Sequence, residues 1–139
     1  MEESHIKINV KASTWEEAIK AAGGILVEVG ASDDAYVLAM VDAVKELGPY
    51  IVITPHVALA HARPSKSVYR PEMSLAILEE PVEFGSAAND PVKLVFAFCA
   101  TDDASHLEQL GHLANKLNPE AIEKLMVATS KEDVLNILK

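Results

Sequence analysis

The chain has 139 residues and a formal net charge of −9 at pH 7, with 12 lysines and arginines against 21 aspartates and glutamates. A chain of this length is typical of one domain with a buried core, here residues 1–139. Nucleic acids and anionic membrane surfaces attract basic patches, so the acidic balance disfavours both as partners. The apolar stretches are too short to cross a bilayer and the N-terminus lacks the pattern of a secretion signal, so we expect a cytoplasmic protein without membrane insertion.

The first third of the chain is predicted to be mainly helical. A weakly alternating segment at 6–10 favours a short edge strand, and apolar residues then recur at helical intervals over 13–30 and again over 32–48. Ser13 and Ser32 open these two segments and are the expected N-caps. Each segment ends in glycine, which is typical of a helix stop.

Strands follow, and then helices again. Four β-branched or apolar segments predict strands at residues 50–54, 57–61, 73–84 and 92–100. The last is apolar on both faces, as expected of a central strand with covered faces. From about residue 102 the pattern turns helical, and two short helices are expected over 118–128 and 130–139. Because helices come before, between and after the strands, we predict an α/β fold with a mixed central sheet of about five strands, flanked by helices on both faces.

The segment TPHVALAHARP, residues 54–64, carries the candidate chemistry. In a continuous strand His56 and His61 would point to opposite faces, whereas His61 and Arg63 would share one face. A guanidinium beside an imidazole opposes a metal cation and suits an anion. A neutral imidazole is a nucleophile toward phosphorus, and Arg63 is placed to bind the resulting phosphoryl group. The spacing alone leaves both phosphoryl transfer and a merely structural loop open.

The remaining histidines and the single cysteine allow other interpretations. His56, His61 and His106 together offer a zinc site, although no His-x-x-x-His pair or cysteine pair supports it. His106 opens a helix, where a solvated or cap-proximal residue is the ordinary interpretation. Cys99 is the only cysteine, so an intrachain disulfide is excluded. Its apolar strand predicts a small buried hydrophobe.

The stretch GPYIVITPHVALAHARP resembles the active-site segment of the type-2 enzyme IIA domains of the phosphoenolpyruvate-dependent sugar phosphotransferase system. The likeness is greatest to the ascorbate-type branch, in which Gly-Pro-Tyr precedes the strand and Arg-Pro follows the histidine. The segment PVEFGSAANDPVKLVFAFCATDDASHLEQLGHLANKL is similar to the second half of these domains, where a helix opens with His-Leu. The resemblance extends from about residue 14 to 138. It departs from the usual pattern at Ala60, where the family has proline.

The resemblance implies a role for individual residues. The phosphorylated histidine of the family falls on His61, with the phosphoryl group on Nε2. Arg63 is implied as the main anion partner, and His106 as a hydrogen-bond partner of the phosphoryl group beside His61. The family arginine that reaches the phosphohistidine corresponds to Lys45, which supplies a positive charge without the planar fork. His56 stands where ascorbate-type relatives often have glycine, and no role is assigned to it.

The resemblance also implies a function and its partners. We expect a phosphotransferase component that accepts phosphoryl from the histidine-containing phosphocarrier protein and passes it to a cysteine of a separate IIB protein, for uptake of ascorbate or a related sugar-like substrate. No metal or organic cofactor is implied, and Val57 and Leu59 are expected in an apolar docking rim. The strand setting of Cys99 does not suit the reactive cysteine of a IIB unit. Two alternative functions remain: a regulatory, nitrogen-type module, and a non-catalytic or metal-binding domain of this fold. The oligomeric state is left open, and a homodimer is one option.

Overall fold

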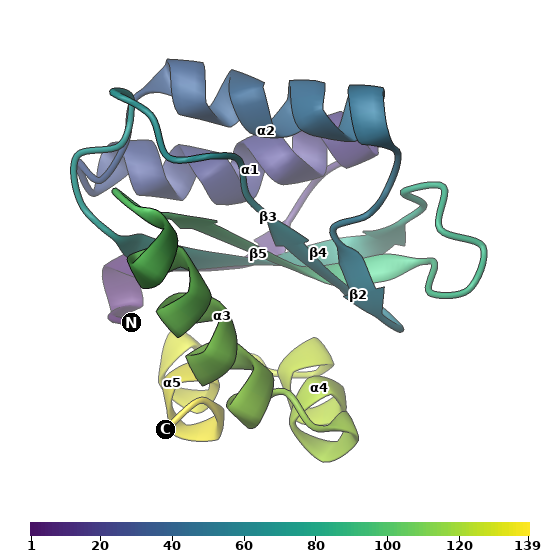
Figure 1. Cartoon of the computed structure of the whole chain (residues 1–139). Helices are drawn as coiled ribbons and strands as arrows, with labels where there is room; N and C mark the ends of the chain where they lie inside the picture. Colours follow the sequence, from purple (N-terminus) through teal and green to yellow (C-terminus); the bar gives the residue numbers. More distant parts are fainter.

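The computed structural model describes residues 1–139 as an α/β fold in which a five-stranded sheet lies between two layers of helices (Figure 1). The predicted fold class is confirmed. The strands are β1 (Ile6–Val10), β2 (Val52–Thr54), β3 (Val57–Ala60), β4 (Glu72–Val82) and β5 (Val92–Cys99). The helices are α1 (Trp15–Glu28), α2 (Asp34–Leu47), α3 (Asp103–Lys116), α4 (Pro119–Met126) and α5 (Lys131–Ile137), and a 3₁₀ turn at Glu3–His5 precedes β1.

The sheet is mixed, with the strand order β1-β4-β5-β3-β2. β1 is parallel to β4 and β3 is parallel to β5, while the pairs β4–β5 and β2–β3 are antiparallel. The parallel ladder of β3 and β5 ends at the pair Ala60 and Ala97. The carboxyl ends of these two central strands therefore meet at one edge of the sheet, with His61 and Phe98 as the next residues in register.

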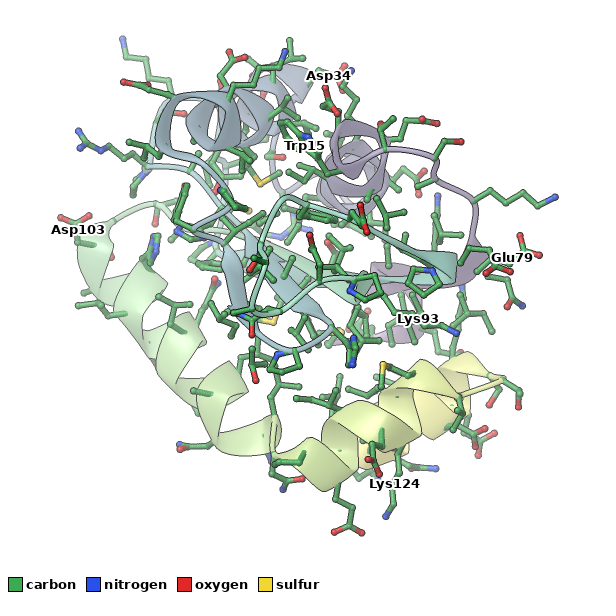
Figure 2. The ribbon with its side chains drawn as sticks, turned by 90° about the vertical axis from the view of Figure 1, so that its right-hand side faces the viewer. Trp15, Asp34, Glu79, Lys93, Asp103 and Lys124 are labelled. Carbon is green, nitrogen blue, oxygen red and sulfur yellow. The ribbon has the colours of Figure 1, made fainter.

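Alternation along β5 divides the core into two clusters. α1 and α2 cover one face of the sheet, and α3, α4 and α5 lie on the other (Figures 1 and 2). The β5 residues that face each side are Val95, Ala97 and Cys99 toward α1 and α2, and Leu94, Phe96 and Phe98 toward α3 to α5. The predicted two-sided burial of this strand is confirmed. Burial raises the pKa of the Cys99 thiol to about 11, so this cysteine is a buried, protonated hydrophobe.

The N-caps of α1 and α2 lie one residue after the predicted serines. The side chains of Thr14 and Asp33 accept main-chain hydrogen bonds at 3.2 and 3.3 Å and cap the two helices. The prediction of Ser13 and Ser32 as caps is wrong, because Thr14 and Asp33 are also good capping residues and the tertiary structure selects between neighbours. At the start of α2, Ser32 forms an isolated β-bridge to Val68, and Asp33, the next residue, is the N-cap.

The helix that carries His106 is only lightly packed. Leu113 is the one buried residue among the fourteen of α3. The helix starts directly after the carboxyl end of β5, so its first turn lies next to the end of β3. None of the helices combines the length and the apolar character that a membrane span requires.

Candidate active site

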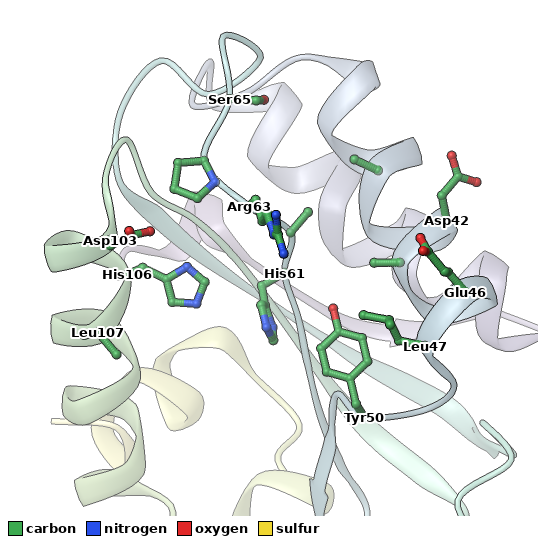
Figure 3. A pocket seen from close by; sticks show the side chains of 14 residues that line it. Asp42, Glu46, Leu47, Tyr50, His61, Arg63, Ser65, Asp103, His106 and Leu107 are labelled. Atoms are coloured by element: carbon green, nitrogen blue, oxygen red, sulfur yellow. The ribbon is translucent and has the colours of Figure 1, made fainter.

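An open pocket of about 1070 Å³ lies at the carboxyl ends of β3 and β5 (Figure 3). Three segments form its walls: the loop that follows β3, the first turn of α3, and the C-terminal half of α2 with the residues after it. His61 is the first residue after β3 and lines this pocket. Figure 3 shows Tyr50, Arg63 and His106 around its ring. The predicted residues His61, Arg63 and His106 are thus brought together, although they come from two distant parts of the chain.

Three aromatic rings surround the imidazole of His61. The Phe98 ring stacks against it, with 5.0 Å between ring centroids and 21° between the ring planes. Tyr50 and His106 contact it edge-on, with centroids at 5.5 and 5.2 Å. Phe98 lies there because it is next to His61 in the extended register of β3 and β5. These contacts restrict the orientation of the imidazole, which is half-buried.

One hydrogen bond fixes the tautomer of His61. Its Nδ1 lies 2.8 Å from the carbonyl oxygen of Leu59. A carbonyl oxygen only accepts hydrogen bonds, so Nδ1 carries the proton and Nε2 keeps its lone pair. Burial lowers the pKa of His61 below the ordinary 6.5; the nearby His106 adds to this, while the bond to Leu59 opposes it. The imidazole is therefore neutral at pH 7, with Nε2 as the basic and nucleophilic atom.

The pKa of His61 can be tested by following its ring protons in an NMR titration. We expect a midpoint below 6.5, so that Nε2 remains unprotonated through pH 6.5 and is protonated only at lower pH. Because the unfolded chain binds this proton more tightly, His61 should also make the folding stability decrease as the pH falls below about 6.5. The His61→Ala spectrum identifies the resonance. A midpoint at or above 6.5 would contradict the burial argument.

The positive charge of the site is supplied by Arg63. Its side chain is exposed, lines the same pocket as His61, and takes part in none of the ion pairs of the chain. The His106 ring makes no hydrogen bond within the chain, whereas His56 and His61 each use Nδ1. An unpaired guanidinium and an unused imidazole beside a neutral nucleophile have the chemistry that suits an anionic group near Nε2.

Comparison with known proteins places the chain in a family. Residues 1–139 match the family described as "Phosphoenolpyruvate-dependent sugar phosphotransferase system, EIIA 2". The chain belongs to this family. It is 32% identical over 139 residues to the ascorbate-specific PTS system EIIA component of Escherichia coli strain K12, covering 99% of this chain and 90% of that protein.

Two solved structures of IIA proteins have the same fold. One is the complex of the mannitol enzymes IIA and phosphorylated IIB of Escherichia coli, with a TM-score of 0.89, 30% identity, and coverage of 99% of this chain and 96% of that one. The other is the nitrogen regulatory protein IIA-Ntr of Neisseria meningitidis, with a TM-score of 0.83, 28% identity, and coverage of 99% and 95%. The predicted resemblance to the EIIA 2 family is confirmed, and the chain is a phosphotransferase system component.

Lys45, the predicted second positive charge, is not among the residues that line the pocket. It is exposed and lies outside the pocket, whose α2 wall includes Asp42 and Glu46. Asp42 and Glu46 are four residues apart and share a helix face, while Lys45 is rotated by about 100° from Glu46. The structure therefore gives no support to the predicted role of Lys45 near the phosphoryl group.

His56 is separated from the other two histidines. It sits in the turn between β2 and β3 with a φ of +73°, and its Nδ1 lies 2.8 Å from the carbonyl oxygen of Pro91. β3 runs between His56 and His61, so the two lie roughly 13–17 Å apart at opposite ends of the strand. The three-histidine zinc site considered from the sequence is not formed, and no other group of three histidine, cysteine or acidic side chains is close enough to hold a metal ion.

The apolar rim of the pocket differs from the predicted one. Val57 and Leu59 are 0% and 4% exposed, so their prediction as docking residues is wrong: both point into the core cluster beneath α3 to α5. The exposed apolar side chains at the pocket are Leu47, Tyr50 and Leu107, with exposed fractions of 67%, 41% and 69%. Apolar side chains this exposed beside a reactive histidine are typical of a protein-docking surface.

Acidic residues also surround the pocket, and sequence reasoning missed them. Asp42, Glu46 and Asp103 line it, and none of them takes part in an ion pair. Tyr50 and Phe98 were likewise not assigned to the site. The register of the parallel strands would have identified Phe98 if the pairing of β3 with β5 had been predictable from the sequence.

Proposed function

We propose that His61 accepts a phosphoryl group on Nε2 from the phosphohistidine of the histidine-containing phosphocarrier protein, and passes it to a cysteine of a separate IIB protein. The observation that carries this proposal is the fixed tautomer: the Leu59 carbonyl holds Nδ1 and leaves the lone pair on Nε2. The lowered pKa of His61 keeps this nitrogen unprotonated near neutral pH. Membership of the EIIA 2 family supports the same reaction.

The transfer follows from these positions. The Nε2 lone pair attacks the phosphorus atom, a new N–P bond forms, and the bond to the donor histidine breaks with its electron pair returning to the donor ring. The His61 ring gains positive charge, which the carbonyl dipole of Leu59 stabilises through Nδ1–H. In the second step a cysteine thiolate attacks the same phosphorus atom. An S–P bond forms, and the electron pair of the N–P bond returns to Nε2.

Arg63 and His106 are proposed to bind the transferred group. Charge spreads over the phosphoryl oxygens during transfer, so catalysis depends mainly on positioning and electrostatic stabilisation. The Arg63 guanidinium has no competing carboxylate partner and can bind two phosphoryl oxygens at once. His106, whose ring is 5.2 Å from that of His61, supplies a further hydrogen bond.

The surface around His61 supports transfer between proteins. Both partners must bring their reactive residue to the same histidine, and the exposed side chains of Leu47, Tyr50 and Leu107 provide apolar contact area there. The unpaired carboxylates of Asp42, Glu46 and Asp103 favour partners with basic side chains around their reactive residue. The mannitol IIA–IIB complex shows that a related IIA protein binds a IIB protein. Similarity to the ascorbate-specific component favours ascorbate or a related compound as the transported substrate, in a cytoplasmic relay.

A reconstituted relay tests this function. The chain is incubated with phosphoenolpyruvate, enzyme I and the histidine-containing phosphocarrier protein, and its intact mass is measured before and after mild acid treatment. We expect one acid-labile phosphoryl group, because the N–P bond of phosphohistidine hydrolyses in acid. Absence of this group would contradict the proposal.

The partner is tested by adding IIB proteins to the phosphorylated chain. An ascorbate-type IIB should remove the phosphoryl group, and the same IIB with its reactive cysteine replaced by serine should not. A mannitol-type IIB serves as the comparison for specificity. If the chain is phosphorylated but delivers to no IIB protein, the transport role is wrong and a regulatory role is favoured, as in the nitrogen regulatory protein of this fold.

A further inference from the structure

A buried tyrosine hydroxyl lies directly behind the pocket. Tyr36 is in the first turn of α2, and its side chain is 1% exposed. Its hydroxyl accepts a hydrogen bond from the Ala62 N–H at 3.0 Å and donates one to the Phe98 carbonyl oxygen at 2.8 Å. Burial raises the pKa of this phenol far above its ordinary value of 10, so the hydroxyl stays protonated and remains a donor.

The hydroxyl takes the place of a missing bond in the sheet. β3 and β5 are parallel, and their register ends at Ala60 and Ala97. The Leu94 N–H donates to the His56 carbonyl oxygen, so the even-numbered residues of β5 direct their main-chain groups toward β3. If the ladder continued, the next bond would join the Ala62 N–H to the Phe98 carbonyl oxygen. In the structure the Tyr36 hydroxyl is inserted between these two groups and satisfies both.

The two residues joined by this hydroxyl flank the reactive group. Ala62 is the residue between His61 and Arg63, so its main chain sets the positions of both. Phe98 stacks on the imidazole of His61 and contacts His106 edge-on with ring centroids 5.0 Å apart. Pro64 follows Arg63 and has no N–H to donate, so it adds no main-chain hydrogen bond of this kind to the loop.

We propose that Tyr36 is a positioning residue for phosphoryl transfer: by bridging Ala62 and Phe98 it holds His61 and Arg63 at the separation that the transferred group requires. This inference rests on the proposed reaction at His61. Tyr36 itself does not line the pocket and is 1% exposed, so it is not placed to touch the transferred group or a docked protein. Its substitution should therefore change the rate of transfer within the complex more than the affinity of the complex.

The test variant is Tyr36→Phe, which keeps the buried ring and removes only the hydroxyl. We expect the rate constant of phosphoryl transfer from the phosphorylated carrier protein to fall on the order of 10- to 100-fold, because small displacements of reacting groups have effects of this size. The KM for the carrier protein should change less than about twofold, because the docking rim is unchanged. In NMR spectra, the Nδ1–H signal and the pKa of His61 should both shift relative to the wild type.

Ser74→Ala is the matched control for loss of a buried hydroxyl. Ser74 is 0% exposed and its Oγ donates to the Ala22 carbonyl oxygen at 2.7 Å, on the α1 side of the sheet. This variant should lose stability while its transfer rate and its His61 resonances stay at the wild-type values. If Tyr36→Phe transfers at the wild-type rate, or if Ser74→Ala slows transfer equally, the positioning role is refuted.

The two levels of the proposal can fail separately. A wild-type chain that is never phosphorylated refutes the function, and the His61 resonances of Tyr36→Phe then still decide whether Tyr36 positions the imidazole. Unchanged resonances refute the positioning role in that case. If the wild type is phosphorylated, the transfer rates and the His61 resonances together decide whether Tyr36 is a positioning residue.

Discussion

His61→Ala should carry no acid-labile phosphoryl group after incubation with the relay proteins, whereas the wild type should carry one. The reason is that Nε2 of His61 is the only imidazole nitrogen in the pocket with a fixed lone pair and a lowered pKa beside an unpaired guanidinium. The loss should be complete, since removal of the nucleophile removes the covalent step itself. Intact-mass analysis of both proteins under identical conditions measures it.

His56→Gly is the matched control, because it removes the other histidine of the same segment. The φ of +73° at His56 suits glycine, so the substitution should relieve backbone strain while it loses the bond to Pro91. We expect wild-type phosphorylation and a change in stability of less than about 1.5 kcal/mol. A phosphoryl group that persists in His61→Ala, or is lost in His56→Gly, would reverse the assignment of the nucleophile.

The two histidines also show how far the sequence predicts the site. Their odd spacing and the proline after Arg63 favoured a pair of His61 with Arg63, because alternation along a strand is a local rule, and the resemblance to the family selected His61 over His56. The structure extends that result, since His56 is in a turn at the other end of β3. Strand, helix and layer predictions succeeded for the same reason: burial alternates along β5 and follows helical intervals in α1 and α2.

What the sequence did not predict depends on strand pairing and helix rotation. The parallel alignment of β3 with β5 places Phe98 on His61, and no local pattern indicates which strands pair. The rotation of α2 puts Asp42 rather than Lys45 at the pocket. Val57 and Leu59 were predicted to be exposed because they are near the histidine, yet the same alternation that directs His61 sends them into the core. Tyr36 is 26 positions from Ala62 and 62 positions from Phe98 along the chain, so no local sequence pattern predicts the bridge between them.

Arg63→Ala should slow phosphoryl transfer to His61 by roughly 10²- to 10³-fold, the usual effect of removing one group that stabilises transition-state charge. Its side chain is exposed and makes no ion pair, so the melting temperature should stay close to that of the wild type. This combination separates a functional role from a structural one. Rapid-mixing measurements with the phosphorylated carrier protein give the rate, and thermal unfolding gives the stability.

Two further substitutions show whether charge or geometry is decisive. Arg63→Lys keeps the positive charge but lacks the planar fork, so it should recover only part of the rate. Lys45→Ala removes a cation of α2 that lies outside the pocket, and should leave the rate within about twofold of the wild type. Equal slowing by Lys45→Ala and Arg63→Ala would mean that general electrostatic attraction, rather than direct contact by Arg63, governs transfer. A large effect confined to Arg63 would place its guanidinium on the phosphoryl oxygens, where the unused hydrogen-bonding capacity of His106 can act on the same group.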